Sequence, residues 1–361
     1  MPSPADALAD PPPRAARPPI APRRPWRVLD LALPAAGLVL LGVLVRRLGG
    51  AALIANLRLV GWGIVLIVGQ EILAILANTL GWRAVFPSER PPPPFGQLLA
   101  ARIAGDAVNY VTPTATLGGE FARVRILHGR ASRLDLATSI AVAKLSQTVA
   151  QAAFVAIGLL LVLAAVPLPN PVRVGLVSGA TLLCALVFAV VLAQRRGMFA
   201  PLVRVATKLD RHDRLAGLSE RMSRLDVEIA RLHRGRRPFL ISCAWFFLGW
   251  TLGALEVGLM LWFLGVPVSV TRAFMIEVLS VAIDATLFFV PGKLGTQEGG
   301  KVLIFSALGL DAAKGLSLGV LRRIRELTWA LVGLVLLGRV QVPRAITSAP
   351  ADAPPARPPA R

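Results

Sequence analysis

Long apolar runs alternate with short polar connectors along the chain, and most of these runs have the length of a membrane-spanning helix. A hydrocarbon core of about 30 Å needs roughly 20 apolar residues in a helix. Runs of this kind lie near residues 28–45, 60–80, 138–164, 173–193, 239–264, 270–290 and 316–338. Two shorter segments, interrupted by proline and glycine, are at about 95–117 and 291–310. The pattern predicts an all-α, polytopic membrane protein with about seven or eight spans plus two broken, re-entrant-like segments.

The runs also indicate two related halves within one membrane domain. We expect this domain to cover residues 28–338, with a first half at about 28–193 and a second at about 239–338. The halves are joined by a basic loop, 194–238, in which apolar residues recur at helical spacing. This spacing predicts an amphipathic helix that lies on the membrane surface or against the bundle.

The charge distribution indicates a membrane surface as the partner of the basic residues. The chain is 55% hydrophobic and 17% charged, with 40 Lys and Arg against 20 Asp and Glu. The tails at 1–27 and 339–361 are rich in proline, alanine and arginine, which predicts disorder. Basic residues beside apolar helices fix topology and attract anionic lipid, so we expect no nucleic-acid partner.

The same residues predict the orientation. Basic clusters in the N-terminal tail, at 118–135 and at 194–238 favour the cytoplasm, whereas the connectors at 165–172 and 265–271 carry no charged side chain. We therefore expect a multi-pass protein of the inner membrane with a cytoplasmic N-terminus. Three basic residues do not fit this orientation, namely Arg46, Arg47 and Arg58.

One motif occurs twice, with a proline, a Leu-Gly pair and then a glutamate. The copies lie at Thr112–Glu120 and Val290–Gly299, and their Leu-Gly pairs are 177 residues apart, close to half the chain. Proline lacks the N–H of a continuing helix, and glycine permits sharp reversals. In lipid, freed backbone groups are tolerated only where protein or water satisfies them. Paired breaks therefore predict two discontinuous helices that line a cavity.

Two alternatives stay open at this point. The motifs could be interfacial loops whose glutamates, Glu120 and Glu298, cap helices. In addition, counting four spans between the motifs places both on one side of the membrane, whereas a re-entrant segment would make the two halves inverted.

Ionisable residues at membrane depth supply the candidate site, because each intramembrane charge needs a partner or water. We expect basic side chains to hold an anionic headgroup, while Glu120 and Glu298 cap the broken helices or gate by protonation. The candidate substrate-binding residues are Asn109, Pro113, Gly118, Gly119, Glu120, Arg123, Pro291, Gly292, Lys293, Gly295, Glu298, Lys301 and Arg322. Of these, the side chains expected to contact the headgroup are Arg123, Lys293, Lys301 and Arg322. The supporting polar residues are Asp106, Lys144, Glu277, Asp284, Arg325 and Glu326.

Ion pairing between or within helices is the alternative role for these charges. Two pairs have the i, i+4 spacing of intrahelical partners, namely Arg102–Asp106 and Arg322–Glu326. Glu71 and Glu256 also lie in apolar spans; a position near a membrane interface stays open for both, and we leave them out of the candidate site.

The sequence carries no motif of a known catalytic centre. It lacks a P-loop, a nucleophile elbow, a zinc signature and a dinucleotide fingerprint. The two cysteines, Cys184 and Cys243, lie in apolar runs, and the three histidines are scattered. We therefore expect a protein that is not an enzyme and that uses neither a cofactor nor a metal.

The two motifs resemble those of the transmembrane-domain family of lysylphosphatidylglycerol synthases, over about residues 30–338. The second motif matches through Pro291, Gly292, Leu294, Gly295, Glu298 and Gly299, and the first through Gly118, Gly119, Glu120 and Arg123. Thr114-Ala115 and Lys144 depart from the family pattern. Asn109, residues 118–123, residues 297–299 and residues 322–326 look more like the hopanoid-biosynthesis-associated branch, whose members stand alone without an aminoacyl-transferase domain.

The resemblance implies lipid translocation or support of a lipid pathway. We expect a flippase-like protein that acts on an anionic or a hopanoid- or isoprenoid-type lipid, with membrane lipids as its partners. The alternative is a scaffold subunit that does not transport and that recruits a lipid-modifying enzyme through residues 194–238.

Overall fold

The structure, a computed structural model, describes residues 42–43, 46, 50–87, 91–112, 117–165, 170–197, 222–223, 226–227, 229–230, 236–286 and 295–339. In this part of the chain the regular elements are helices. They are α2 (Gly50–Val60), α3 (Gly63–Ala84), α4 (Phe95–Val111), α5 (Leu117–Ile126), α6 (Arg133–Ala165), α7 (Asn170–Arg196), α10 (Arg236–Phe263), α11 (Val270–Thr286), α12 (Thr296–Ala307) and α13 (Ala312–Arg339). The predicted all-α fold is confirmed. The tails, and most of the predicted span at 28–45 and of the loop at 194–238, lie outside the described residues.

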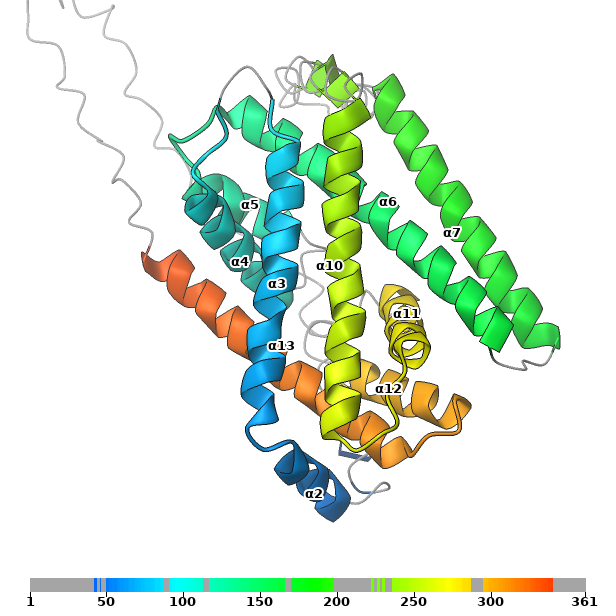
Figure 1. Cartoon of the computed structure of the whole chain (residues 1–361). Coiled ribbons are helices and arrows are strands. Elements are labelled where there is room, and N and C mark those ends of the chain that lie inside the picture. Colours follow the sequence, from blue (N-terminus) through cyan, green and yellow to red (C-terminus); the bar gives the residue numbers. More distant parts are fainter. Residues whose placement is uncertain are drawn as a thin grey trace, which may run out of the picture.

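Two long helices, α3 and α10, lie side by side in the middle of the bundle (Figure 1). Glycines make their contact close: a Cβ on Gly63 would lie 2.6 Å from the ring of Phe263, and one on Gly81 would lie 3.1 Å from Phe246. The N-terminal end of α3 therefore meets the C-terminal end of α10, so the two helices are antiparallel. Small residues at such contacts let helices approach in lipid, where van der Waals packing drives association.

The remaining helices repeat around this central pair. The series α3, α4, α5, α6 corresponds in order to α10, α11, α12, α13, and α4 lies against α13 as α11 lies against α6. Both α4 and α11 have 17 residues. Glu120 near the start of α5 and Glu298 near the start of α12 are 178 positions apart, as are Pro113 and Pro291. The predicted duplication is thus visible as two sets of four helices.

The two sets have opposite orientations. Because α3 and α10 are antiparallel, the helices that follow them start from opposite ends of the bundle, and in Figure 1 the chain directions along α6 and α13 are opposed. The structure therefore corresponds to the inverted alternative and not to two motifs on the same side.

Each break is followed by a short helix that returns along the preceding one. In the first set, a Cβ on Gly105 would lie 2.7 Å from Arg123, and one on Gly119 would lie 2.4 Å from Asn109. The residue nearer the end of α5, Arg123, thus meets the residue earlier in α4, Gly105. This order of contacts identifies α4 and α5 as an antiparallel hairpin. At 17 residues α4 is about 26 Å long, and the chain reverses after Val111.

Among the described residues, four helices are long and apolar enough to cross a membrane: Gly63–Ala84, Arg133–Ala165, Arg173–Ala193 and Arg236–Phe263. The last helix, α13, has 28 residues, but one of its turns carries four charged side chains. Helix α7 belongs to neither set and packs along α6 (Figure 1). Apolar clusters lie toward both ends of α10, around Phe246 at one end and around Met260 at the other. Glu256 lies between these two residues along α10.

Candidate functional site

The charged turn of α13 lies at the centre of a buried ion-pair cluster. Arg322 donates to Glu277 of α11 over 2.6 Å and to Glu256 of α10 over 3.4 Å. The three side chains are at most 7% exposed. Arg322 therefore joins three helices of the second set.

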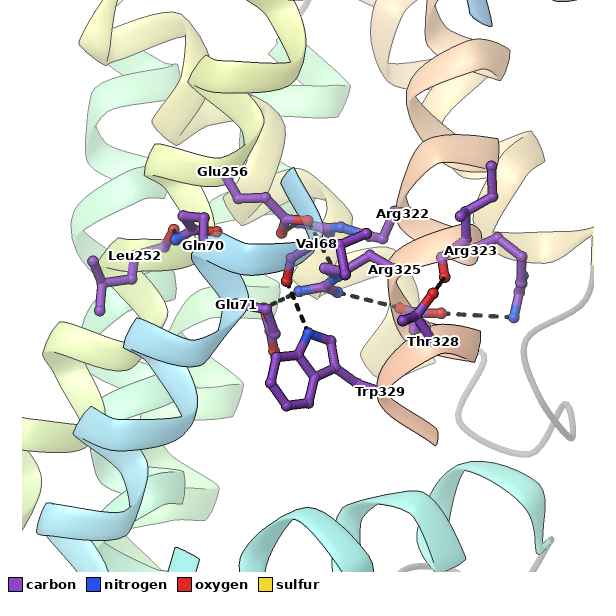
Figure 2. Close-up of polar contacts among 12 residues, drawn as sticks. Val68, Gln70, Glu71, Leu252, Glu256, Arg322, Arg323, Arg325, Thr328 and Trp329 are labelled. Atoms are coloured by element: carbon purple, nitrogen blue, oxygen red, sulfur yellow. Dashed lines mark hydrogen bonds and ion pairs between the residues drawn. The ribbon is translucent and has the colours of Figure 1, made fainter. Parts of the chain in front are cut away.

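Arg325, one turn further along α13, extends the cluster into the first set (Figure 2). Its Nε lies 3.1 Å from Glu256, and the same guanidinium pairs with Glu71 of α3. Glu326 lies 3.7 Å from Arg325 and accepts a hydrogen bond of 3.0 Å from Gln297 of α12. Arg325 thus connects α13 to the central helices of both sets.

This arrangement follows from helical spacing and from the cost of a charge in a membrane. Residues three apart share a helix face, so Arg322 and Arg325 point into the same interior. An unpaired charge at that depth is costly, and each neighbouring helix supplies an acid to meet it. Together, Arg322 and Arg325 contact four carboxylates, those of Glu71, Glu256, Glu277 and Glu326. Two further basic residues adjoin these four carboxylates: Arg323, which lies 3.7 Å from Glu326, and the buried Lys301 of α12.

A polar cavity of about 300 Å³ adjoins the cluster. Its charged lining residues are Glu71, Glu256, Glu277, Asp284, Glu326, Arg322 and Arg325, and its amide residues are Asn78, Gln147, Gln151 and Gln297. Gln297 is 1% exposed, and its Oε1 is a buried acceptor without a hydrogen-bond partner. The lining therefore offers more acceptors and negative charges than donors.

A smaller cavity of about 130 Å³ lies on the other side of Arg325. It is formed mainly by α4 and α13, and it includes Asp106 and Tyr110. Glu71, Arg325 and Glu326 line both cavities. We call these three residues the partition, because they separate the polar cavity from the smaller one.

The first motif has its own ion-pair network, next to the partition. Arg123 of α5 donates to Asp106 of α4 over 2.6 Å and to Glu120 over 2.8 Å. Asp106 also accepts from Arg102 over 2.9 Å, so the predicted i, i+4 pair on α4 is present. The guanidinium of Arg123 lies 5.6 Å from the ring centroid of Trp82, within the range of a cation–π contact. In this state, carboxylates already neutralise Arg123.

Close backbone packing holds this hairpin together. The N–H of Gly119 donates to Oδ1 of Asn109 over 2.7 Å, and a Cβ on Gly119 would lie 2.2 Å from the carbonyl oxygen of Gly105. Both candidate residues therefore have a structural role at the break, and Gly118 is the neighbouring residue in α5. Only glycine fits at position 119.

The second motif is tied to α13, and through Arg323 of α13 to Tyr110 of α4. Glu298 is 1% exposed and accepts a hydrogen bond of 3.0 Å from Arg323. Gly295 precedes α12 with φ +71°, a conformation that favours glycine. Lys301 is buried on α12, at 1% exposure.

The structure brings part of the predicted site together. Glu277, Asp284, Arg322, Arg325 and Glu326 all line the polar cavity. Asn109, Gly119, Glu120, Arg123 and Asp106 form the hairpin network. Lys144 of α6 is exposed, but it lies near enough for its charge to act on Glu120 and Arg123 of this network. Four candidates, Pro113, Pro291, Gly292 and Lys293, lie outside the described residues.

Two central residues were missing from the predicted site. Glu256 is fully buried, and both Glu71 and Glu256 line the polar cavity. The i, i+4 pairing of Arg322 with Glu326 is replaced by pairs with Glu256 and Glu277. An acid in the middle of each central span was the available signal, since such a charge needs a partner from another helix.

The fold and this site define a class: a helical membrane protein with inverted repeats, a short helix after each break, and a polar cavity lined by helices of both sets. Residues 28–334 match the family model described as lysylphosphatidylglycerol synthase TM region. The chain belongs to that family. Comparisons with curated proteins and with solved structures gave no match.

Proposed function

We propose that this protein translocates a membrane lipid whose headgroup passes through the polar cavity. The observation that carries the proposal is the charged cavity between two inverted sets of helices. In transporters built from inverted repeats, the substrate site lies near the bilayer midplane at the repeat interface, next to discontinuous helices. Membership of a lipid-related membrane family supports the same class of substrate. The protein then acts as a carrier and not as an enzyme.

The charge of the cavity lining restricts which lipid headgroups can bind there. The cavity has five carboxylates and two guanidinium groups in its wall, and both guanidinium groups are already paired. Arg123, the described cation of the first motif, is also paired. A purely anionic headgroup would meet repulsion there, whereas a headgroup that carries a positive charge beside its phosphate would find acceptors. We therefore propose a lipid with an amino group, in place of a purely anionic one.

The partition lies in the path of a headgroup that moves between the two cavities. A headgroup that passes from the polar cavity to the smaller one must displace the contacts of Arg325 with Glu71 and Glu326. Helices α6 and α11 flank the polar cavity, and α4 and α13 flank the smaller one. Exchange of these two arrangements would expose the headgroup first to one leaflet and then to the other, as inverted repeats allow.

The test is lipid movement in vesicles that contain the purified full-length protein. Phosphatidylethanolamine, phosphatidylglycerol and its aminoacyl ester, each with a fluorescent label on an acyl chain, are followed by chemical quenching of the outer leaflet. We expect the protein to accelerate the two amine-bearing lipids by about tenfold over phosphatidylglycerol, the equivalent of ~1.4 kcal/mol. No acceleration of any of the three lipids would overturn the proposal.

A pair of matched variants distinguishes the transport function from the alternative scaffold function. Glu71→Gln removes one partner of Arg325 in the partition and should change the rate, whereas Glu298→Gln alters a residue outside both cavities. A scaffold subunit would support its lipid pathway in cells with both variants, and would lose that support when residues 205–232 are deleted. The cytoplasmic N-terminus, the inner-membrane location and the hopanoid-associated branch remain parts of this proposal.

A further inference from the structure

A largely apolar groove lies between α7 and the adjacent helices α6 and α11. Its volume is about 440 Å³, and α7 contributes Gly175, Gly179 and Ala180 to its wall. Val278 and Val281 of α11 also line it. Pockets for small ligands are typically about 300–1,000 Å³, so the groove has the size of a binding site. Its lining suits hydrocarbon and not a polar solute.

The groove adjoins the polar cavity. Gln151 of α6 and Val281 of α11 line both hollows. On one side of these two residues the walls carry carboxylates, guanidinium groups and amides, and on the other side they are almost entirely aliphatic. A lipid has the same division between its headgroup and its chains.

The glycines of α7 leave the groove unfilled. A Cβ on Gly158 of α6 would lie 2.1 Å from Val278, as expected of a glycine that permits close helix packing. In contrast, a Cβ on Gly175 or Gly179 would have no neighbouring atom within 4 Å. These two glycines therefore do not bring helices together. Their effect is open space beside α11.

The apolar path continues beyond the groove. A second apolar hollow, of about 560 Å³, runs along the contact of α6 and α7 and shares Leu159 and Ala180 with the groove. Elsewhere on α7, Leu182 and Phe188 are 71% and 70% exposed, as expected of a helix that faces the acyl chains of the bilayer. The two hollows thus lead from the polar cavity toward the lipid-facing surface.

We propose that this groove binds one hydrocarbon chain of the lipid whose headgroup occupies the polar cavity. Gln151 and Val281 mark the junction between the two parts of the site. The inference rests on the proposed function for the identity of the headgroup, but the chain site is a separate claim with its own measurement.

Photocrosslinking in vesicles tests the chain site. The full-length protein is reconstituted with phosphatidylethanolamine that carries a diazirine on one acyl chain, and labelled peptides are identified by mass spectrometry. We expect labels within residues 278–282 of α11, which face the groove, together with labels on α7. Labels confined to the exposed side chains of α7 and the other lipid-facing helices would overturn the inference.

A pair of substitutions on α7 makes the test specific. Gly179→Phe places a ring in the open space of the groove and should abolish most of the labelling at 278–282. Leu182→Phe enlarges an exposed side chain of the same helix and should leave that labelling unchanged. Size-exclusion profiles in detergent verify folding, and Gly179→Leu replaces the first variant if it aggregates. Unchanged labelling with either groove-filling variant would overturn the inference.

The crosslinking experiment and the transport experiment test the chain site and the carrier function separately. Specific labelling at 278–282 without lipid translocation would retain the chain site and reject the carrier function. Translocation without such labelling, or translocation that Gly179→Phe leaves at full rate, would retain the carrier and reject this site.

Discussion

Arg323 on α13 donates a hydrogen bond of 2.7 Å to the hydroxyl of Tyr110 on α4. The same guanidinium donates to Glu298 on α12 over 3.0 Å. Tyr110 immediately precedes the first break, and Glu298 follows the second. One side chain therefore ties both broken segments to the last helix, on the side of the bundle where α4 meets α13.

Replacing Tyr110 by phenylalanine tests this connection. Tyr110→Phe removes the acceptor but keeps the ring, so it should lower the free energy of unfolding by about 1.5–3 kcal/mol, the range for a hydrogen bond to a charged group. The measurement is thermal unfolding in detergent. The control is Thr328→Val, which loses only an exposed hydrogen bond to Ile324 within α13. Equal shifts for both variants would show that the Tyr110 contact contributes nothing specific.

Replacing Arg322 should destabilise the protein more than replacing Tyr110, because Arg322 pairs with two buried carboxylates. Arg322→Met leaves Glu256 with Arg325 as its remaining partner and leaves Glu277 without its arginine. Removing one member of a buried pair typically costs about 3–5 kcal/mol, so the single variant should be severely destabilised. The double variant Arg322→Met/Glu277→Gln should recover a large part of the loss. Additive destabilisation in this double-mutant cycle would contradict the coupling.

Gly119 provides a steric prediction. Gly119→Ala would place a Cβ 2.2 Å from the carbonyl oxygen of Gly105, so the α4–α5 hairpin must open or the variant must fail to accumulate. Gly96 near the start of α4 is the matched control, because a Cβ there meets open space. Gly96→Ala should raise stability by up to about 1 kcal/mol. Expression and unfolding temperature compare the two, and a tolerated Gly119→Ala would contradict the close packing.

The antiparallel central pair predicts which ends share a face of the membrane. Exposed positions at the α2–α3 turn and after α10 should react together with an impermeant maleimide added to intact cells, as tested with Trp62→Cys and Val268→Cys. Gly96→Cys and Arg237→Cys, at the other ends of the bundle, should react only after permeabilisation. The background replaces Cys184 and Cys243 by serine. Reaction of Val268→Cys with the second pair would reject the inverted arrangement.

The class of fold and the two breaks could be predicted because both depend on local sequence. The length of an apolar run decides whether a helix can span lipid, and proline followed by Leu-Gly interrupts a helix wherever it occurs. The repeated glutamates, Glu120 and Glu298, then marked the start of α5 and of α12.

The ion-pair partners could not be predicted, because they depend on how helices distant in sequence pack. Spacing within α13 favoured Glu326 as the partner of Arg322, and the antiparallel packing instead presents Glu256 and Glu277. Glu71 reaches Arg325 from a helix 254 positions earlier in the chain. The acidic excess of the cavity follows from these distant contacts, which is why the sequence favoured an anionic headgroup.

Helix α7 determines the orientation of the second half relative to the first. The first set enters and leaves the bundle at the same end, because its hairpin returns and only α3 and α6 cross fully. With no further crossing, the second set would start at that end and the halves would be parallel. In the described part of the chain, α7 is the one additional helix that runs along the bundle between the two sets, and it changes an even number of crossings into an odd one (Figure 1). A chain from which α7 were deleted would have to insert its second half upside down or leave it outside the bilayer.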